Sequence, residues 1–102
     1  MDQKKDREMI KKYINFLREN DFNIEKVYLF GSYAKGVVTE DSDIDLAVVF
    51  KKLSDSFDMQ VQLMKMRRKF DTRIEPHPFE ESDFNSSNPL AREILNTGFE
   101  IV

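Results

Sequence analysis

The chain of 102 residues contains no cysteine and only one histidine. Without cysteine there can be no disulfide, no thiol nucleophile and no thiolate-bound zinc, which is compatible with a reducing compartment. No segment approaches the roughly 20 consecutive apolar residues that span a bilayer. The N-terminal residues also lack the apolar run of a signal peptide. We therefore expect a soluble, cytoplasmic protein with no membrane contact.

An excess of basic residues is also missing, since the net charge is −3 and the isoelectric point is about 5.2. A nucleic-acid partner held by a broad basic surface is therefore disfavoured. The one basic run, "KMRRK" at 65–69, is better explained as the solvated side of a helix. The length, with 40% hydrophobic and 34% charged residues, is typical of one globular domain covering residues 1–102.

Helix-like and strand-like segments alternate along the chain. Helices are expected at 4–20, at 55–70 and from about Pro89 to Gly98, with Gly98 in the C′ position that favours glycine. Strands are expected at 25–30, 44–50 and 72–79, and residues 99–102 could add a terminal strand. Because Pro76 and Pro78 interrupt the 72–79 segment, it should fray or lie at a sheet edge. The order predicts an α/β (α+β) fold, a small mixed β-sheet with helices packed against it.

The segment "DSDIDLAVVF" places two carboxylates at the start of a predicted strand. Side chains alternate in a strand, so Asp43 and Asp45 point to one side while Ile44 points to the other. Their α-carbons would lie about 6–7 Å apart, close enough for the carboxylates to bracket one or two hard cations. Oxygen ligands favour Mg²⁺ or Mn²⁺. Taken alone, the pattern is more often a solvated acidic turn.

The segment "GSYAKG" at 31–36 follows a predicted strand and opens a short helix, and a polar loop at 37–43 comes next. Gly31 permits a sharp turn that brings backbone N–H groups near a phosphate, and Ser32 adds a hydroxyl at a helix N-terminus. Gly36 lets the chain leave the helix. This turn alone is equally compatible with an ordinary connection. With the two strands side by side, however, its donors would face the carboxylates across a gap suited to a metal–triphosphate.

The blocks "LFGSYAKG" (29–36) and "DSDIDLAVV" (41–49) resemble the nucleotidyltransferase superfamily, and at this length the minimal nucleotidyltransferase (MNT) domains. The resemblance implies that Gly31 and Ser32 hold the β- and γ-phosphates of a nucleoside triphosphate. It also implies that Asp43 and Asp45 are catalytic residues that bind Mg²⁺, with two ions expected and Mn²⁺ as a substitute. Lys35 either approaches the phosphates or is an exposed helix lysine.

The family carries a third carboxylate on a neighbouring strand, and this sequence offers two candidates for it. Glu75 lies inside the predicted strand and is preferred as catalytic residue and metal ligand, with Asp71 as the alternative. A glutamate departs from the usual aspartate. The lone histidine, His77, lies between two prolines and is not expected to bind metal, because no second histidine is present.

By resemblance, the function is transfer of a nucleoside monophosphate, with ATP as the expected donor and pyrophosphate as the product. The acceptor should be small or carried by a separate polypeptide, since the chain is short. MNT proteins are commonly paired with HEPN-domain toxins, which they neutralise by transferring AMP to a tyrosine. Exposed apolar residues such as Phe57 could add to such a partner surface. The alternative is a catalytically silent module that binds nucleotide or masks a partner.

Overall fold

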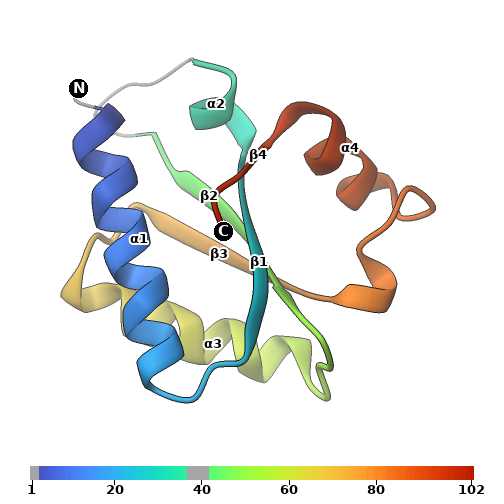
Figure 1. The fold of residues 1–102 in the computed structure, drawn as a ribbon, viewed down its shortest axis with the longest axis horizontal. Coiled ribbons are helices and arrows are strands. Elements are labelled where there is room, and N and C mark those ends of the chain that lie inside the picture. Colours follow the sequence, from blue (N-terminus) through green and yellow to red (C-terminus); the bar gives the residue numbers. More distant parts are fainter. Residues whose placement is uncertain (1–2, 37–41) are drawn as a thin grey trace.

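The computed structural model describes residues 3–36 and 42–102, in which helices and strands alternate around one sheet (Figure 1). The elements are α1 (Gln3–Glu19), β1 (Ile24–Phe30), α2 (Gly31–Ala34), β2 (Ile44–Phe50), α3 (Ser56–Met66), β3 (Ile74–Glu80), α4 (Pro89–Thr97) and β4 (Phe99–Glu100). Two 3-10 turns, η1 (Arg67–Lys69) and η2 (Glu81–Asp83), flank β3. The expected loop at 37–43 falls mostly outside the described residues.

The sheet has four strands in the order β3-β2-β1-β4. Strand β1 runs antiparallel to both β2 and β4, whereas β2 and β3 are parallel. Sheets of this mixed kind need a crossover between the parallel strands, and α3 supplies it. The expected α+β fold with a mixed sheet is confirmed.

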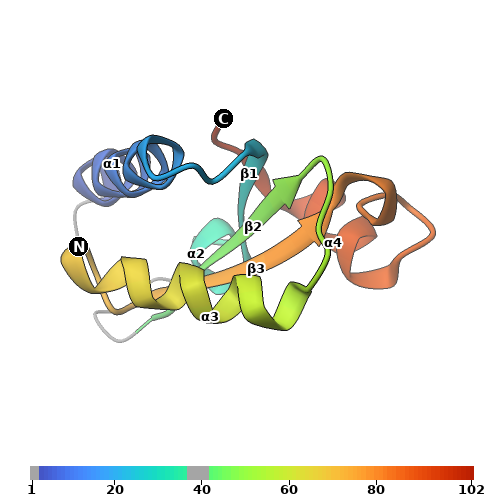
Figure 2. The ribbon, with the colours of Figure 1, turned by 90° about the horizontal axis from the view of Figure 1, so that it is seen from below.

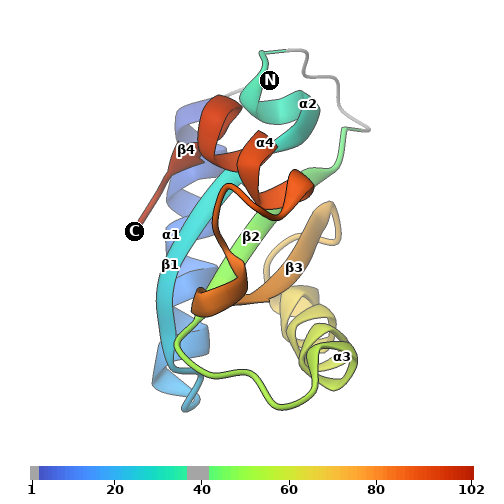
Figure 3. The ribbon, with the colours of Figure 1, turned by 90° about the vertical axis from the view of Figure 1, so that its right-hand side faces the viewer.

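One face of the sheet is covered by α1 and α3, and α4 lies over the other (Figure 3). The buried stripe of α1 consists of Ile10, Tyr13, Ile14 and Leu17, at helical spacing. It packs on alternate strand residues that are fully buried, such as Leu46 and Val48. The Tyr13 hydroxyl is satisfied inside this core, because it donates to the Leu63 carbonyl oxygen at 2.8 Å. Burial of each such side chain contributes about 1.5–3 kcal/mol.

The segment expected to form one helix at 55–70 divides into two parts. Asp55 caps α3 by accepting a hydrogen bond from the Asp58 N–H at 3.0 Å, and the α-helix ends at Met66 before the 3-10 turn η1. Along this segment the apolar residues Met59, Leu63, Met66 and Phe70 recur at helical spacing. Leu63 is fully buried, and the other three pack, partly buried, against the same core.

Strand β3 is the edge strand that its prolines predict, and α3 runs alongside it (Figure 2). Two of its outward carbonyl oxygens accept from side chains of this neighbouring segment. The Pro76 oxygen accepts from Gln60 Nε2 at 3.3 Å, and the Ile74 oxygen accepts from Arg67 Nη1 at 2.6 Å. Proline lacks the N–H that an added strand would need, so this edge is closed to further pairing.

Gly98 follows α4 as predicted, but its conformation is not the left-handed one of a glycine cap. Its φ is −89°, which any residue can adopt. Glycine is needed here for space, because an added Cβ would lie 2.7 Å from the Ile94 carbonyl oxygen and 2.8 Å from that of Leu29. The close approach lets β4 return directly onto β1. Among the described residues, none of the helices has the length and apolar character required to cross a membrane.

Candidate functional site

The sheet face beneath α4 carries acidic residues at its end nearest α2. The β1–β2 and β2–β3 registers put Phe30, Asp45 and Glu75 in one row across three strands. The next row along β2 contains Ala47 opposite His77, and beyond it Val49 pairs with Phe79. Ala47 and Val49 are buried. Asp45, Glu75 and His77 are thus grouped at the end of this face nearest α2.

Gly31 brings the turn after β1 into contact with β2. Its φ of +76° is a left-handed conformation that favours glycine. A Cβ at this position would also overlap the carboxylate of Asp45, with Oδ2 as the nearest atom. The turn and the carboxylate are therefore packed directly against each other. Ser32, the next residue, is exposed at the start of the short α2.

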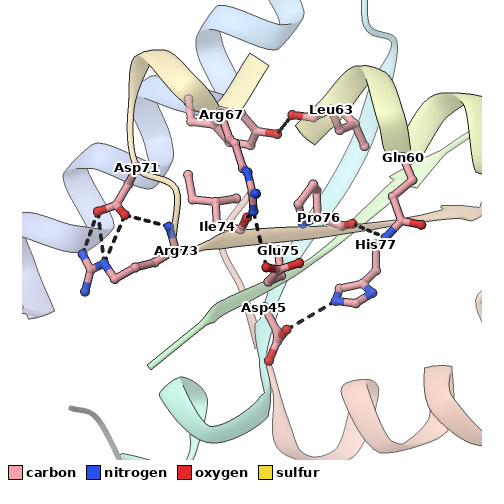
Figure 4. A network of polar contacts seen from close by, with 11 residues as sticks. Asp45, Gln60, Leu63, Arg67, Asp71, Arg73, Ile74, Glu75, Pro76 and His77 are labelled. Carbon is pink, nitrogen blue, oxygen red and sulfur yellow. Dashed lines mark hydrogen bonds and ion pairs between the residues drawn. The ribbon is translucent and has the colours of Figure 1, made fainter. Parts of the chain in front are cut away.

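Asp45 and Glu75 project from neighbouring strands on the same side of the sheet (Figure 4). Glu75 accepts from Arg67 Nη1 at 3.3 Å, and the two side chains are mostly buried. Asp45 Oδ1 lies 3.3 Å from His77 Nε2. Asp43, two residues earlier, is exposed at the start of β2.

The oxygen donors of Asp43, Asp45 and Glu75 suit a hard cation such as Mg²⁺ in their chemistry. They are not gathered around one point, however. Within residues 3–36 and 42–102, no group of three or more acidic, histidine or cysteine side chains is arranged to hold a metal ion. Two of the three carboxylates face protein partners instead, Asp45 toward His77 and Glu75 toward Arg67. A bound cation would have to draw Glu75 from its arginine.

Asp71, the alternative third carboxylate, belongs to a separate network at the start of β3. Arg73 Nη2 lies 2.7 Å from Asp71 Oδ2 and 3.1 Å from Asp6 Oδ1. The hydrogen bonds that Arg73 donates to Asp71 hold the pKa of Asp71 below its usual range. Glu75, rather than Asp71, is the residue paired with Asp45 across the strands.

Lys35 lies at the end of α2, where its Nζ is 3.7 Å from Glu93 Oε1 of α4. Both side chains are more than half exposed, at 53% and 59%. Exposed ion pairs of this kind contribute little to stability, so the lysine can leave Glu93 at small energetic cost.

His77 is the residue of this site that sequence reasoning overlooked. The sequence suggests for it only the role of a metal ligand, which the lack of a second histidine disfavours. The signal that could have found it is the strand period of two, which puts residues 75 and 77 on the same side of β3. Its ring also packs near that of Phe30, with centroids 5.3 Å apart.

Tyr33 anchors α2 to α1 and yields a test of the local network. Its buried hydroxyl donates to Asp6 Oδ2 at 2.8 Å. Burial, and then the Asp6 carboxylate, raise the pKa of Tyr33 to about 12. The unfolded chain titrates near 10. The contribution of the Tyr33 hydroxyl to the free energy of unfolding is therefore fully present below about pH 10 and is lost as pH rises toward 12.

We predict that Tyr33→Phe lowers the free energy of unfolding by about 1.5 kcal/mol or more at pH 7, because a hydrogen bond to a carboxylate is lost. The difference from wild type should shrink between about pH 10 and 12. Urea unfolding at a series of pH values measures it. A gap that stays constant across this range would show that the Tyr33–Asp6 bond does not contribute as described.

Comparison with known proteins assigns the chain to a family. The family model described as polymerase beta, nucleotidyltransferase, matches residues 11–102, so the chain belongs to this family of nucleotidyltransferases. Among characterised relatives it is similar to the protein adenylyltransferase MntA of Shewanella oneidensis, with 35% identity over 69 residues. That alignment covers 55% of this chain and 50% of MntA, so the chain spans about half the length of this relative.

Solved structures of toxin–antitoxin complexes share the fold. A mutant of the MntA-HpeT toxin-antitoxin superposes with a TM-score of 0.61 and 27% identity, covering 88% of this chain and 68% of the other. A second likeness is to a complex of tri-AMPylated HEPN toxin with MNT antitoxin from Shewanella oneidensis. Its TM-score is 0.56 at 21% identity, covering 92% of this chain and 69% of the other, which is a likeness of fold alone.

Proposed function

We propose that this protein is a Mg²⁺-dependent nucleotidyltransferase that transfers AMP from ATP to a tyrosine hydroxyl of a HEPN toxin, and so acts as its antitoxin. The observation that carries the proposal is the position of Asp45, in contact with the Gly31 turn on one side and paired with Glu75 on the other. Membership of the nucleotidyltransferase family supports the reaction class. Similarity to the protein adenylyltransferase MntA supports AMP as the group transferred, and similarity to a chain of the MntA-HpeT toxin-antitoxin supports a toxin as the partner. The HEPN class of that partner is what the resemblance to MNT domains implies.

Gly31 and Ser32 would bind the β- and γ-phosphates of ATP. The Gly31 backbone can approach a phosphate closely because no side chain intervenes, and the exposed Ser32 hydroxyl is available as a donor. Lys35 would add a positive charge by turning from Glu93 toward the phosphates. These groups bind the part of ATP that leaves as pyrophosphate.

Asp43, Asp45 and Glu75 would hold Mg²⁺. When bound, the cation neutralises phosphate charge and lowers the pKa of a nearby hydroxyl. The carboxylates could not otherwise lie beside a triphosphate, since both are negatively charged. Asp45 is the central ligand in this arrangement because it contacts the phosphate-binding turn directly.

Glu75 would accept the proton of the attacking hydroxyl. The acceptor oxygen forms a bond to the α-phosphorus as the bond from that phosphorus to the bridging oxygen breaks, and pyrophosphate leaves toward Gly31 and Ser32. In-line displacement would place the acceptor hydroxyl opposite the leaving pyrophosphate. Arg67 Nη1 lies 3.3 Å from Glu75 Oε1, so the carboxylate would have to exchange this partner for the acceptor hydroxyl.

The acceptor side of the site has apolar residues at the molecular surface. An open groove beside His77 is lined by Phe57, Phe79 and Leu90. Phe57 is 76% exposed and Leu90 is 43% exposed. Exposed aromatic and aliphatic side chains next to a reaction centre suit a protein acceptor that presents a tyrosine.

The assignment of Glu75 is tested by two matched amide substitutions. We predict that Glu75→Gln lowers the rate of AMP transfer by about 10²–10⁴-fold, the usual contribution of a general base. Asp71→Asn should leave the rate within a few-fold of wild type while lowering stability, because it breaks the pair with Arg73. Pyrophosphate release measures the first effect and thermal unfolding the second. If Asp71→Asn abolished transfer and Glu75→Gln did not, the assignment would be reversed.

The silent-module alternative has one observation in its favour, the engagement of Glu75 by Arg67. Metal-dependent pyrophosphate release in the presence of the partner separates the two functions. Partner binding without any release would favour masking over catalysis.

A further inference from the structure

We infer that His77 is a positioning residue that holds the Asp45 carboxylate so that Oδ2 faces the phosphate-binding turn. The inference rests on the proposed function and deepens it, since it assigns different tasks to the two oxygens of one carboxylate. It gives a role to a residue outside the Gly-Ser and Asp-x-Asp motifs.

The two oxygens of Asp45 have different neighbours. Oδ1 lies 3.3 Å from His77 Nε2, and Oδ2 is the atom nearest to the position of a Cβ on Gly31. With Nε2 carrying the hydrogen, the imidazole donates to Oδ1 and leaves Oδ2 without that partner. The contact is drawn in Figure 4, where His77 approaches Asp45 from the side of β3. Oδ2 is therefore the oxygen that packs against the Gly31 turn, which is the proposed phosphate-binding turn.

His77 is itself held in place, which a positioning residue requires. It sits on β3 opposite Ala47, and its ring packs near the Phe30 ring with centroids 5.3 Å apart and an angle of 60°. Pro76 and Pro78 flank it and restrict the backbone on both sides. The side chain is 35% exposed, so its ring is mostly enclosed. The backbone of β3 and the Phe30 ring thus fix the position of the imidazole.

The gain from such a contact is orientational. The terminal torsion of an aspartate is broad, so a free carboxylate samples many orientations. A donor fixed on a rigid strand narrows that range before a cation arrives, and partners of metal-binding side chains commonly change metal affinity by 10–100-fold. Here the donor and the carboxylate come from adjacent strands, which fixes their separation through the sheet.

Three substitutions separate the hydrogen bond from the packing of the ring. His77→Ala removes both, His77→Gln keeps an N–H donor without the ring, and His77→Phe keeps an aromatic ring without the donor. The readout is the Kd for Mn²⁺ in the presence of a non-hydrolysable ATP analogue, measured by electron paramagnetic resonance of free Mn²⁺. No turnover is needed. Thermal unfolding of each variant checks that it is folded.

We expect His77→Ala and His77→Phe to weaken Mn²⁺ binding about 10-fold or more, and His77→Gln to stay within about 3-fold of wild type. In an Asp45→Ala background, His77→Ala should have no further effect, because its action passes through that carboxylate. Mn²⁺ binding near that of wild type in His77→Phe but not in His77→Gln would overturn the inference, since packing of the ring would then explain the effect on Mn²⁺ affinity. Equal loss in all three variants, or no loss in any, would also overturn it.

The failure of the inference and the failure of the proposed function give different results. If wild type binds Mn²⁺ with the analogue but the variants do not follow the expected pattern, the positioning role alone is wrong. If wild type binds no Mn²⁺ under these conditions, the metal-dependent function is wrong, and the role of His77 is wrong with it.

Discussion

Gly31→Ala is expected to destabilise the protein and to abolish nucleotide binding together. A side chain at φ +76° costs about 1–2 kcal/mol in backbone strain. The new Cβ would also overlap the Asp45 carboxylate, and overpacking of this kind costs a further 1–3 kcal/mol, roughly. The carboxylate or the turn must move to relieve the overlap. Urea unfolding measures the stability, and titration with a fluorescent ATP analogue measures the binding.

Gly36→Ala is the matched control for this substitution. Gly36 also has a positive φ, at +80°, but within the described residues no heavy atom beyond its chain neighbours lies within 4 Å of the position of its Cβ. The Gly36→Ala variant should therefore lose only the free energy of unfolding due to backbone strain, about 1–2 kcal/mol, and should still bind nucleotide. Equal effects at the two glycines would mean that the contact between Gly31 and Asp45 has no functional consequence.

Asp45→Asn is expected to have the largest effect on activity. The amide keeps the shape of the side chain but removes the negative charge that would hold Mg²⁺. Several kcal/mol of transition-state stabilisation depend on such a metal, and each 1.36 kcal/mol changes the rate tenfold. We expect AMP transfer to fall by about 10³-fold or more, with little change in the melting temperature. Rates of pyrophosphate release over a series of Mg²⁺ concentrations measure the loss.

The control for Asp45→Asn is Asp83→Asn, which neutralises an exposed carboxylate in η2. It makes the same change in net charge away from the proposed site. Its rate should match wild type. A normal rate for Asp45→Asn at ordinary Mg²⁺ concentrations would remove Asp45 from the metal site and with it the proposed mechanism.

The fold could be predicted closely from the sequence because its periodicities are unambiguous. The run at 44–50 is typical of a buried strand, and the apolar residues of α1 recur at helical spacing. The prolines of β3 predict a strand that frays or lies at an edge. The position of β1 between β2 and β4 depends on pairing between distant segments, which local patterns do not contain. Likewise, α3 ends at Met66 rather than at 70, in a region where Arg67 binds the Ile74 carbonyl oxygen.

Local spacing alone predicts the candidate site only where its residues lie close together in the sequence, and Glu75 follows from the resemblance to the family. The spacing of Asp43 and Asp45, and the glycine before a short helix, are local signals. The pairing of Asp45 with Glu75 depends on the parallel register of β2 and β3, a relation between residues 30 positions apart. The same register places His77 next to Asp45. The chemical roles of these residues stay predictions, which the substitutions above address.

Transfer of label from ATP to a partner tests the central claim most directly. The chain would be isolated from its native host with its bound partner and incubated with Mg²⁺ and ATP labelled at the α-phosphate. The comparison is between wild type and the Asp43→Ala/Asp45→Ala variant. We predict that label joins a tyrosine of the co-purified protein with wild type and that the variant transfers none. A partner that binds both forms and receives label from neither would contradict the account and leave a masking protein with the fold of a nucleotidyltransferase.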